Sequence, residues 1–425
     1  MSTSEEPVAE LTPASSTAAP AASTARYARK KQAIVAAASE ILNRDGVKGM
    51  TLASVASRVG LITTSVTYYF KKKEDLAVAC FLDGIERFDE VTTEALQASD
   101  PKAKLLRLLD RWLELHRRIA IGEAPPIAVF NDIRALQKPQ RTLVLEAYMR
   151  FFAKLRSIFV APELAYFDAK NITARAHVLT EQIFWAKAWL PRYDIEDLGR
   201  IRDRMFDIFV NGFALPGSEW RSQSLPLDDV LPYVELDATS RETFLIAATR
   251  LINDRGYRGA SVEKISARLN VTKGSFYHHN DTKDDLVVEC FKRSFEAMRR
   301  VQRAVTDEPR DHWSKLMTVA TTLVNYQLSS RGPLLRTTAL SALPAAIRQS
   351  MVEASNRVSD RFSSIISDGI AAGSVRPVDT FIASQMLTAT LNASAEINYW
   401  IPGVSTEEAV QLYAKTMLMG TFANS

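Results

Sequence analysis

The chain has 425 residues, a length that allows two or more domains, each with its own core. Its 53 basic and 49 acidic residues leave a net charge of +4, which excludes a polybasic chain, so any contact with a polyanion would depend on local patches. Two cysteines argue against a disulfide framework, and no apolar run is long enough to span a bilayer. The N-terminus lacks the apolar core of a signal peptide, so we expect a cytoplasmic protein without a membrane partner.

Residues 1–25 are rich in Ala, Ser, Thr and Pro and have no periodic apolar spacing, which predicts a disordered tail. The tail is followed directly by a basic cluster of Arg26, Arg29, Lys30 and Lys31. Two interpretations of this cluster stay open. It is either the solvated start of a helix or an arm that contacts backbone phosphates of a nucleic acid.

From Tyr27 onward, apolar residues recur at the spacing of one helix face, and Gly46 is expected to end that first helix. The same pattern returns in the second half of the chain, where Gly256 is expected to end the helix. Further amphipathic stretches follow in both halves, and no alternating strand pattern is convincing. The sequence therefore predicts an all-α protein.

The two halves are repeats of each other. Residues 51–76 align with 261–286 without a gap at an offset of 210, and eleven positions are identical between 40–81 and 250–291. The tripeptide Trp189-Leu-Pro191 meets Trp400-Ile-Pro402 at an offset of 211. Because the offset barely changes along the half, we infer that an entire domain is duplicated.

Each repeat contains the pattern of a helix-turn-helix. Thr51 and Ser261 are suitable N-caps for a short first helix, and Gly60 and Asn270 tolerate the left-handed backbone of a tight turn. Second short helices follow at about 62–68 and 272–278, and they are dense in Thr, Ser, Tyr, His and Lys. These side chains contact phosphates and base edges when a helix lies in the major groove, so the pattern indicates duplex DNA as the partner.

At this point the chain resembles the tetracycline-repressor (TetR-like) family of transcription regulators. The family pattern is roughly Ser/Thr-Lys-Gly-Ser/Thr-aromatic-Tyr-His/Tyr-Tyr-Phe, followed after two residues by Lys-Glu/Asp-x-Leu. The second repeat reads Thr272-Lys-Gly-Ser-Phe-Tyr-His-His279 and then Lys283-Asp-Asp-Leu286. The first repeat reads Thr64-Ser-Val-Thr-Tyr-Tyr-Phe70 and then Lys73-Glu-Asp-Leu76.

The resemblance implies a set of DNA-binding residues in each repeat. They are Thr51, Thr63, Thr64, Ser65, Thr67, Tyr68, Tyr69 and Lys73 in the first, and Ser261, Lys273, Gly274, Ser275, Tyr277, His278, His279 and Lys283 in the second. The alternative is that the aromatic and apolar residues of this region only pack the small bundle, which is the better interpretation for Phe70 and Leu76. The two recognition helices differ at most exposed positions, so we expect unlike half-sites if both read one operator.

Both repeats also depart from the family pattern. The first has Thr63-Thr64 where Lys-Gly is usual, and the second has Asn280 in place of the packing Phe and His279 in place of Tyr. These departures keep open a second function, a helical protein-interaction or regulatory module in which one or both units no longer bind DNA. An all-helical enzyme has little support, because no nucleophile elbow, catalytic triad or phosphate-binding glycine loop is present.

By the same resemblance, the remaining helices form ligand-binding and dimerisation domains whose last two helices pair with a partner. The candidate pairs are 171–189 with 194–212, and 376–399 with 405–422. The two pairs either meet each other in a single-chain pseudo-dimer or pair with a second chain in a homodimer. The high effective concentration of a tethered partner favours the pseudo-dimer. Four aromatic residues are candidates for the wall of an effector pocket or, alternatively, ordinary helix core: Tyr148, Phe152, Phe184 and Trp185.

The predicted domains are a tail (1–25), a first helix-turn-helix domain (26–87), a first regulatory domain (88–213), a linker (214–237), a second helix-turn-helix domain (238–297) and a second regulatory domain (298–425). Cys80 and Cys290 occupy equivalent positions, which favours an inherited buried site over a redox sensor. The histidines show no metal-ligand spacing, so we expect no metal and no cofactor. The sequence predicts a DNA-binding transcription regulator, a repressor that a small-molecule effector releases.

Overall fold

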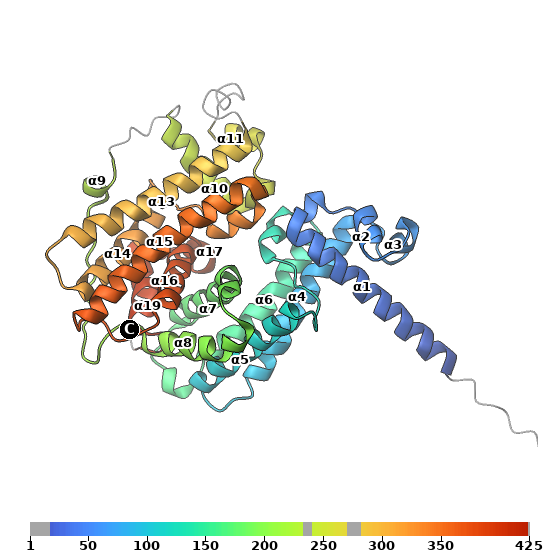
Figure 1. The fold of residues 1–425 in the computed structure, drawn as a ribbon, viewed down its shortest axis with the longest axis horizontal. Coiled ribbons are helices and arrows are strands. Elements are labelled where there is room, and N and C mark those ends of the chain that lie inside the picture. Colours follow the sequence, from blue (N-terminus) through green and yellow to red (C-terminus); the bar gives the residue numbers. More distant parts are fainter. Residues whose placement is uncertain (1–17, 233–239, 270–281, 424–425) are drawn as a thin grey trace, which may run out of the picture.

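The computed structural model describes residues 18–232, 240–269 and 282–423, and within these ranges the only regular secondary structure is helical (Figure 1). The predicted all-α class is confirmed. None of the described helices is both long and apolar enough to cross a membrane.

Within the described residues, the second half repeats the helix order of the first, and the position equivalent to α3 lies outside those residues. The first half contains α1 (Ala18–Gly49), α2 (Leu52–Arg58), α3 (Thr63–Tyr69), α4 (Lys73–Ala95), α5 (Pro101–Ala120), the 3-10 turn η1 (Phe130–Ala135), α6 (Gln140–Arg156), α7 (Ala169–Trp189) and α8 (Leu198–Asn211). The second contains α10 (Arg241–Gly259), α11 (Val262–Leu269), α13 (Lys283–Asp307), α14 (His312–Leu328), the 3-10 turn η6 (Thr337–Ala342), α15 (Ala345–Ala371), α16 (Thr380–Ser394), α17 (Ile397–Trp400) and a last helix formed by α18 (Thr406–Val410), η7 (Gln411–Lys415) and α19 (Thr416–Met419).

The structure differs from the sequence expectation at the N-terminus, where a disordered tail was expected through residue 25. Helix α1 already begins at Ala18, because this stretch is rich in alanine, the strongest helix former, and Pro20 lies in the first turn, where proline is tolerated. The expected end of the first helix is also found. Gly46 has a φ of 66° and breaks the helical backbone, and Gly256 does the same in α10 with a φ of 71°.

Two identical residues of the repeat perform the same structural task. The side chain of Asn43 in α1 donates to the Ile127 carbonyl (2.9 Å) and accepts from the Val129 amide (2.7 Å). Asn253 in α10 donates to the Leu334 carbonyl (2.9 Å) and accepts from the Arg336 amide (3.1 Å). Each asparagine therefore fixes the loop that leads into the 3-10 turn of its own half. The first helix of each helix-turn-helix unit, called a head below, is thus fastened to the helices that follow the unit.

The halves pack against each other through α7 and α16. Gln182 of α7 donates to the Met386 carbonyl at 2.6 Å, and the indole of Trp185 donates to Gln385 at 3.0 Å. Helix α8 and the η7–α19 helix complete a four-helix arrangement around this contact, near the centre of the molecule (Figure 1). The helices that the sequence selected for pairing thus meet inside one chain.

The ends of α8 and α19 cross at close range. The Phe213 amide donates to the Leu418 carbonyl, and the Thr421 amide donates to the Phe209 carbonyl, each at 2.7 Å. Gly212 and Gly420 lie at this crossing with φ angles of 60° and 100°. A Cβ at either glycine would overlap backbone atoms of the other half, so only glycine allows the two chain segments to come this close.

The predicted linker, 214–237, is not extended where it is described. It follows α14, because the Leu225 amide donates to Thr322 at 3.0 Å and the Trp313 indole donates to the Glu219 carbonyl at 3.1 Å. A short helix, α9 (Leu227–Val230), lies within it. Apolar residues of the linker, such as Trp220 and Leu225, pack on the core, which is why the segment does not behave as a free spacer.

The glycine crossing predicts that alanine is far more destabilising at Gly212 than at a glycine outside the crossing. Gly212→Ala should lower the free energy of unfolding by about 3 kcal/mol or more, since it combines a disfavoured backbone region with backbone overlap. Gly403→Ala is the matched control, because Gly403 also has a positive φ of 77° but has no atom within 4 Å of the added Cβ. It should cost only about 1–2 kcal/mol. Urea denaturation of the full chain measures both, and equal losses would contradict a tight crossing.

Candidate nucleic-acid interface

The first helix-turn-helix has the local features that its sequence requires. Thr51 caps α2, accepting from the Ser54 amide at 3.0 Å, while the Ser54 hydroxyl accepts from the Thr51 amide. Gly60 follows the helix with a φ of 66°, which the expected left-handed turn needs. The turn leads directly into α3, so the two short helices are held at a fixed angle by their own backbone.

Helix α3 has one buried face and one exposed face. Val66 is fully buried and Phe70 is 6% exposed, so these two residues anchor the helix on the core. Thr63, Thr64 and Tyr68 are exposed, Tyr68 at 67%. The remaining predicted contact residues, Ser65, Thr67 and Tyr69, are half-buried. A helix anchored on one side and polar on the other is the element that can lie in a major groove.

Besides Thr51, two further predicted contact residues of the first repeat have partners within the protein. The Lys73 ammonium donates to the Lys48 carbonyl at 2.9 Å, near the end of α1, and the Thr67 hydroxyl donates to the Thr63 carbonyl at 2.8 Å. Lys71 and Lys72, which the sequence analysis did not select, are exposed beside them. Their position directly after α3 was visible in the sequence as a run of three lysines.

An aromatic group joins α1 to α3. The ring of Tyr27 lies 4.8 Å from the ring of Tyr69 and 6.1 Å from that of Tyr68, and the two latter rings are 5.2 Å apart. The Lys31 ammonium lies 5.8 Å from the centroid of the Phe70 ring. The start of α1 therefore lies beside the exposed face of α3, which spacing along the chain did not reveal.

The second helix-turn-helix is described only in part. Its first helix, α11, is anchored by the fully buried Ile265, and the Ser261 hydroxyl accepts from the Lys264 amide at 3.4 Å. Lys283 lies 4.2 Å from the Tyr257 ring centroid. The other predicted contacts, Lys273, Gly274, Ser275, Tyr277, His278 and His279, lie outside the described residues, as do Asn270 and Asn280.

The two cysteines have matching surroundings. Cys80 lies 3.6 Å from the Val35 carbonyl oxygen, and Cys290 lies 3.6 Å from that of Leu245. Burial raises the pKa of both thiols to about 12. A thiol with such a pKa forms little thiolate at neutral pH, so both cysteines have the character of buried core residues.

The aromatic residues proposed for an effector pocket divide into two groups. Phe152 stacks on Trp400 of the second half at 4.2 Å, and Tyr148 lies 6.3 Å from the same ring. Phe184 lies 5.3 Å from Phe130. Trp185 instead bonds to Gln385, so it contributes to the junction between the halves.

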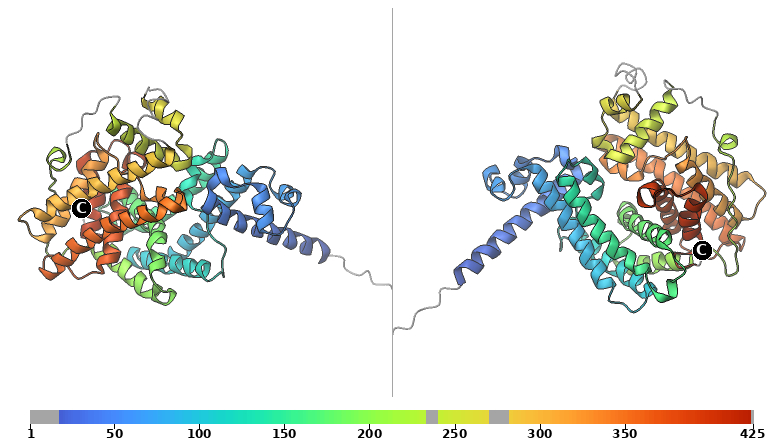
Figure 2. Two further views of the ribbon diagram at one scale, coloured as in Figure 1. Left: turned by 45° about the horizontal axis from the view of Figure 1, so that its top comes forward. Right: turned by 180° about the vertical axis from the view of Figure 1, so that it is seen from behind.

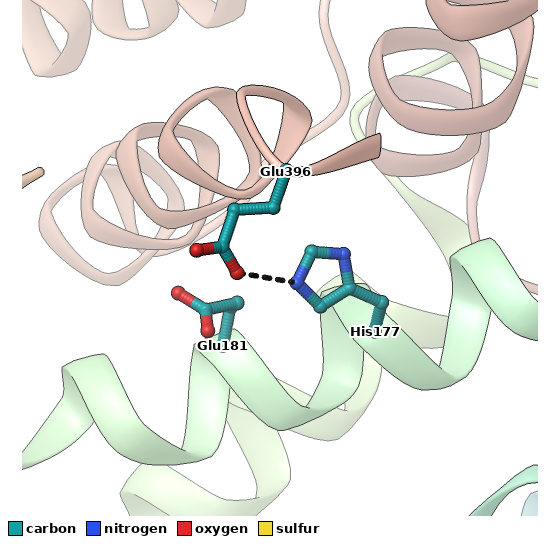
Figure 3. A group of neighbouring side chains, drawn as sticks. All are labelled: His177, Glu181 and Glu396. Atoms are coloured by element: carbon teal, nitrogen blue, oxygen red, sulfur yellow. Dashed lines mark ion pairs between the residues drawn. The ribbon is translucent and has the colours of Figure 1, made fainter. Parts of the chain in front are cut away.

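A buried charged cluster lies next to these aromatic rings. His177 and Glu181 come from α7, and Glu396 comes from the second half, between α16 and α17 (Figure 3). Arg336 binds both carboxylates, Glu181 at 3.0 Å, and Arg134 binds Glu396. The sequence analysis found no metal-ligand spacing among the histidines and missed this group. The four-residue spacing of His177 and Glu181 was the available signal.

The charges of the cluster balance without a cation. Burial alone would raise the pKa of Glu396, but Arg336 and Arg134 outweigh it and lower the pKa to about 2. Burial lowers the pKa of His177, whose Nδ1 lies 2.7 Å from the Tyr413 hydroxyl and whose Nε2 is 3.8 Å from Glu396. Two guanidinium groups thus neutralise two carboxylates around a neutral imidazole. A divalent cation would add uncompensated charge, so we assign the cluster a structural role.

Comparison with known proteins decides the nature of the repeat. The model of the tetR family of bacterial regulatory proteins matches residues 34–80 and again residues 244–290. Both helix-turn-helix units belong to the tetR family. The matches run from within α1 to within α4 and from within α10 to within α13, so each contains the helix-turn-helix of one head.

The Transposon Tn10 TetC protein of Escherichia coli is 29% identical over 85 residues, which are 20% of this chain and 43% of TetC. The chain thus spans less than half the length of that TetR-like relative. Among solved structures, the TetR family transcriptional regulator PfmR from Thermus thermophilus is 20% identical and matches 43% of this chain and 98% of its own, with a TM-score of 0.36. The regulator FadR from Bacillus subtilis, solved in complex with stearoyl-CoA, is 18% identical over 41% of this chain and 97% of its own, with a TM-score of 0.32.

The charged cluster predicts that Glu396→Gln is strongly destabilising. Both arginines would lose the carboxylate that they share, which should lower the free energy of unfolding by about 3–5 kcal/mol. The control is Glu408→Gln, which breaks the exposed ion pair between Lys170 and Glu408 across the same two halves and should cost far less, because solvent screens an exposed pair.

Acid titration of stability adds a second readout. The pKa of Glu396 is lowered from 4.5 to about 2, so its contribution is present above about pH 4.5 and is lost as the pH falls toward 2. The difference in unfolding free energy between the native chain and Glu396→Gln should therefore shrink across this range. A difference that does not change with pH would contradict the ionised state of Glu396.

Proposed function

We propose that the protein is a sequence-specific, DNA-binding transcription regulator that represses by covering a promoter and is released by a small-molecule effector. The observation that carries the proposal is the exposed face of α3, presented by a capped helix and a glycine turn and anchored by Val66 and Phe70. Membership of both units in the tetR family supports it. The expected contacts are the residues that the sequence analysis selected in the two repeats.

We further propose that one chain acts as a pseudo-dimer with two unlike heads. The α7–α16 contact and the reciprocal backbone bonds of α8 and α19 support it, because they satisfy within one chain the surfaces expected to pair. Light scattering at micromolar concentration should give the mass of one chain. A mass of two chains would favour the homodimer.

The buried cluster offers a route from an effector to a head. Arg134 of the first half donates both to Glu396 and to the Asn253 carbonyl in α10, the first helix of the second head. An effector that displaces Trp400 or Tyr148 beside this cluster would change how α10 sits relative to α1. The heads would then no longer match successive major-groove faces, and the protein would leave its operator.

The test is selection of bound duplexes from a random pool by the full-length chain, beside Tyr68→Ala and Lys273→Ala. Tyr68 is exposed, so its loss should not disturb folding but should remove a base or phosphate contact and weaken binding about tenfold. We expect a site with two unlike halves, of which each variant relaxes one.

Other outcomes separate the alternatives. A perfect palindrome that responds to one variant only would mean that one head does not bind DNA. If the native chain enriches no duplex, the protein-interaction module becomes the better description and the proposal fails.

A further inference from the structure

The N-terminal part of α1 is exposed helix. Every residue from Thr24 to Ala33 is exposed, and burial begins only at Ile34. Figures 1 and 2 show this part of α1 projecting past α2 and α3, away from the rest of the molecule. A helix segment that buries no apolar face gains little from tertiary packing, so its exposed face is available to a partner.

The side chains of this segment are basic and lie close to the recognition helix. Tyr27 contacts Tyr68 and Tyr69, and Lys31, one turn later, lies over Phe70. This stripe of α1 therefore faces α3. Arg26 and Lys30 form the adjacent stripe, because each precedes one of these residues by one position and they are four residues apart. Within the described residues, neither makes an ion pair.

The described part of the second head shows no such segment. Helix α10 begins at Arg241, the position equivalent to Lys31, because the Ser240 hydroxyl caps it by accepting from the Thr243 amide at 3.2 Å. The first helix has no comparable stop and continues for 13 further residues toward the N-terminus. The sequence accounts for this difference, because the second repeat has the capping Ser240 where the first repeat has Lys30.

The net charges of the two heads differ accordingly. Residues 26–80 contain ten basic and four acidic residues, a net charge of +6. The equivalent residues 236–290 contain eight basic and eight acidic residues, a net charge of zero. Because phosphate neutralisation supplies most of the sequence-independent affinity for DNA, the first head should carry most of it.

We propose that residues 26–31 of α1 form a phosphate-binding arm beside the first recognition helix, with Arg26 and Lys30 as its contacts to the duplex backbone. The inference rests on the proposed DNA-binding function and deepens it. The arm fastens one head to the duplex without reading bases, and the second head, as far as it is described, contains no equivalent. The protein therefore binds an operator with one strongly held half and one weakly held half.

The test compares the full-length Arg26→Gln/Lys30→Gln double variant with a control double variant, Lys102→Gln/Arg200→Gln. The control removes the same charge from exposed positions of α5 and α8 in the regulatory domain. The affinity for the selected duplex is measured at several salt concentrations. If both residues contact phosphates, the slope of log K against log salt should become shallower by about 1.8, at about 0.9 per contact. Affinity at moderate salt should fall by roughly tenfold or more.

The control variant should keep the native slope, and circular dichroism should show that both variants retain their helix content. An arm variant with the native slope, and with an affinity within about twofold of the control, would overturn the arm while leaving the regulator intact. If the native chain enriches no duplex, the arm and the proposed function fall together.

Discussion

The contact between the two halves is the constraint on which the rest of the structure depends. Helices α7 and α16 pack tightly, and the ends of α8 and α19 come so close that Gly212 and Gly420 cannot carry a side chain. The same junction buries Glu396 from one half between arginines from both. Since neither half can satisfy these groups alone, the halves are parts of one folding unit even though each repeats the other.

Equivalent asparagine contacts fasten both heads to this unit, but the second head has an additional bond. Asn43 and Asn253 hold the loops before η1 and η6 in the same way. Only Asn253 also receives Arg134 from the opposite half through its carbonyl. The second head is therefore connected directly to the buried cluster, whereas the first is distinguished by the long basic start of α1. The two repeats share the asparagine bonds, and they differ in the Arg134 bond and in the length of the first helix.

The sequence predicted the fold class and both helix breaks, because these depend on local periodicity and on glycines with a special backbone. It showed the repeat through its own alignment, whereas the pairing helices were expected only from the family resemblance. It also identified Phe70 as core. The cluster of His177, Glu181 and Glu396 was missed because its members come from distant segments and only the tertiary contact brings them together. The internal bond of Lys73 was missed for the same reason. The sequence analysis placed the start of α1 too late. The Ala-, Ser-, Thr- and Pro-rich composition of residues 1–25 indicated disorder, although its alanines favour a helix.

Pairing within one chain has a consequence for how occupancy responds to abundance. When a regulator must first dimerise and its copies are scarce, the concentration of the DNA-binding dimer falls with the square of the monomer concentration. If this chain acts as the proposed pseudo-dimer, its halves, joined by Gln182, Trp185 and the α8–α19 crossing, would keep the two heads together at any dilution. Its occupancy of a site would then follow copy number linearly. A substitution in one repeat would also alter one head alone, so the two recognition surfaces are free to change independently.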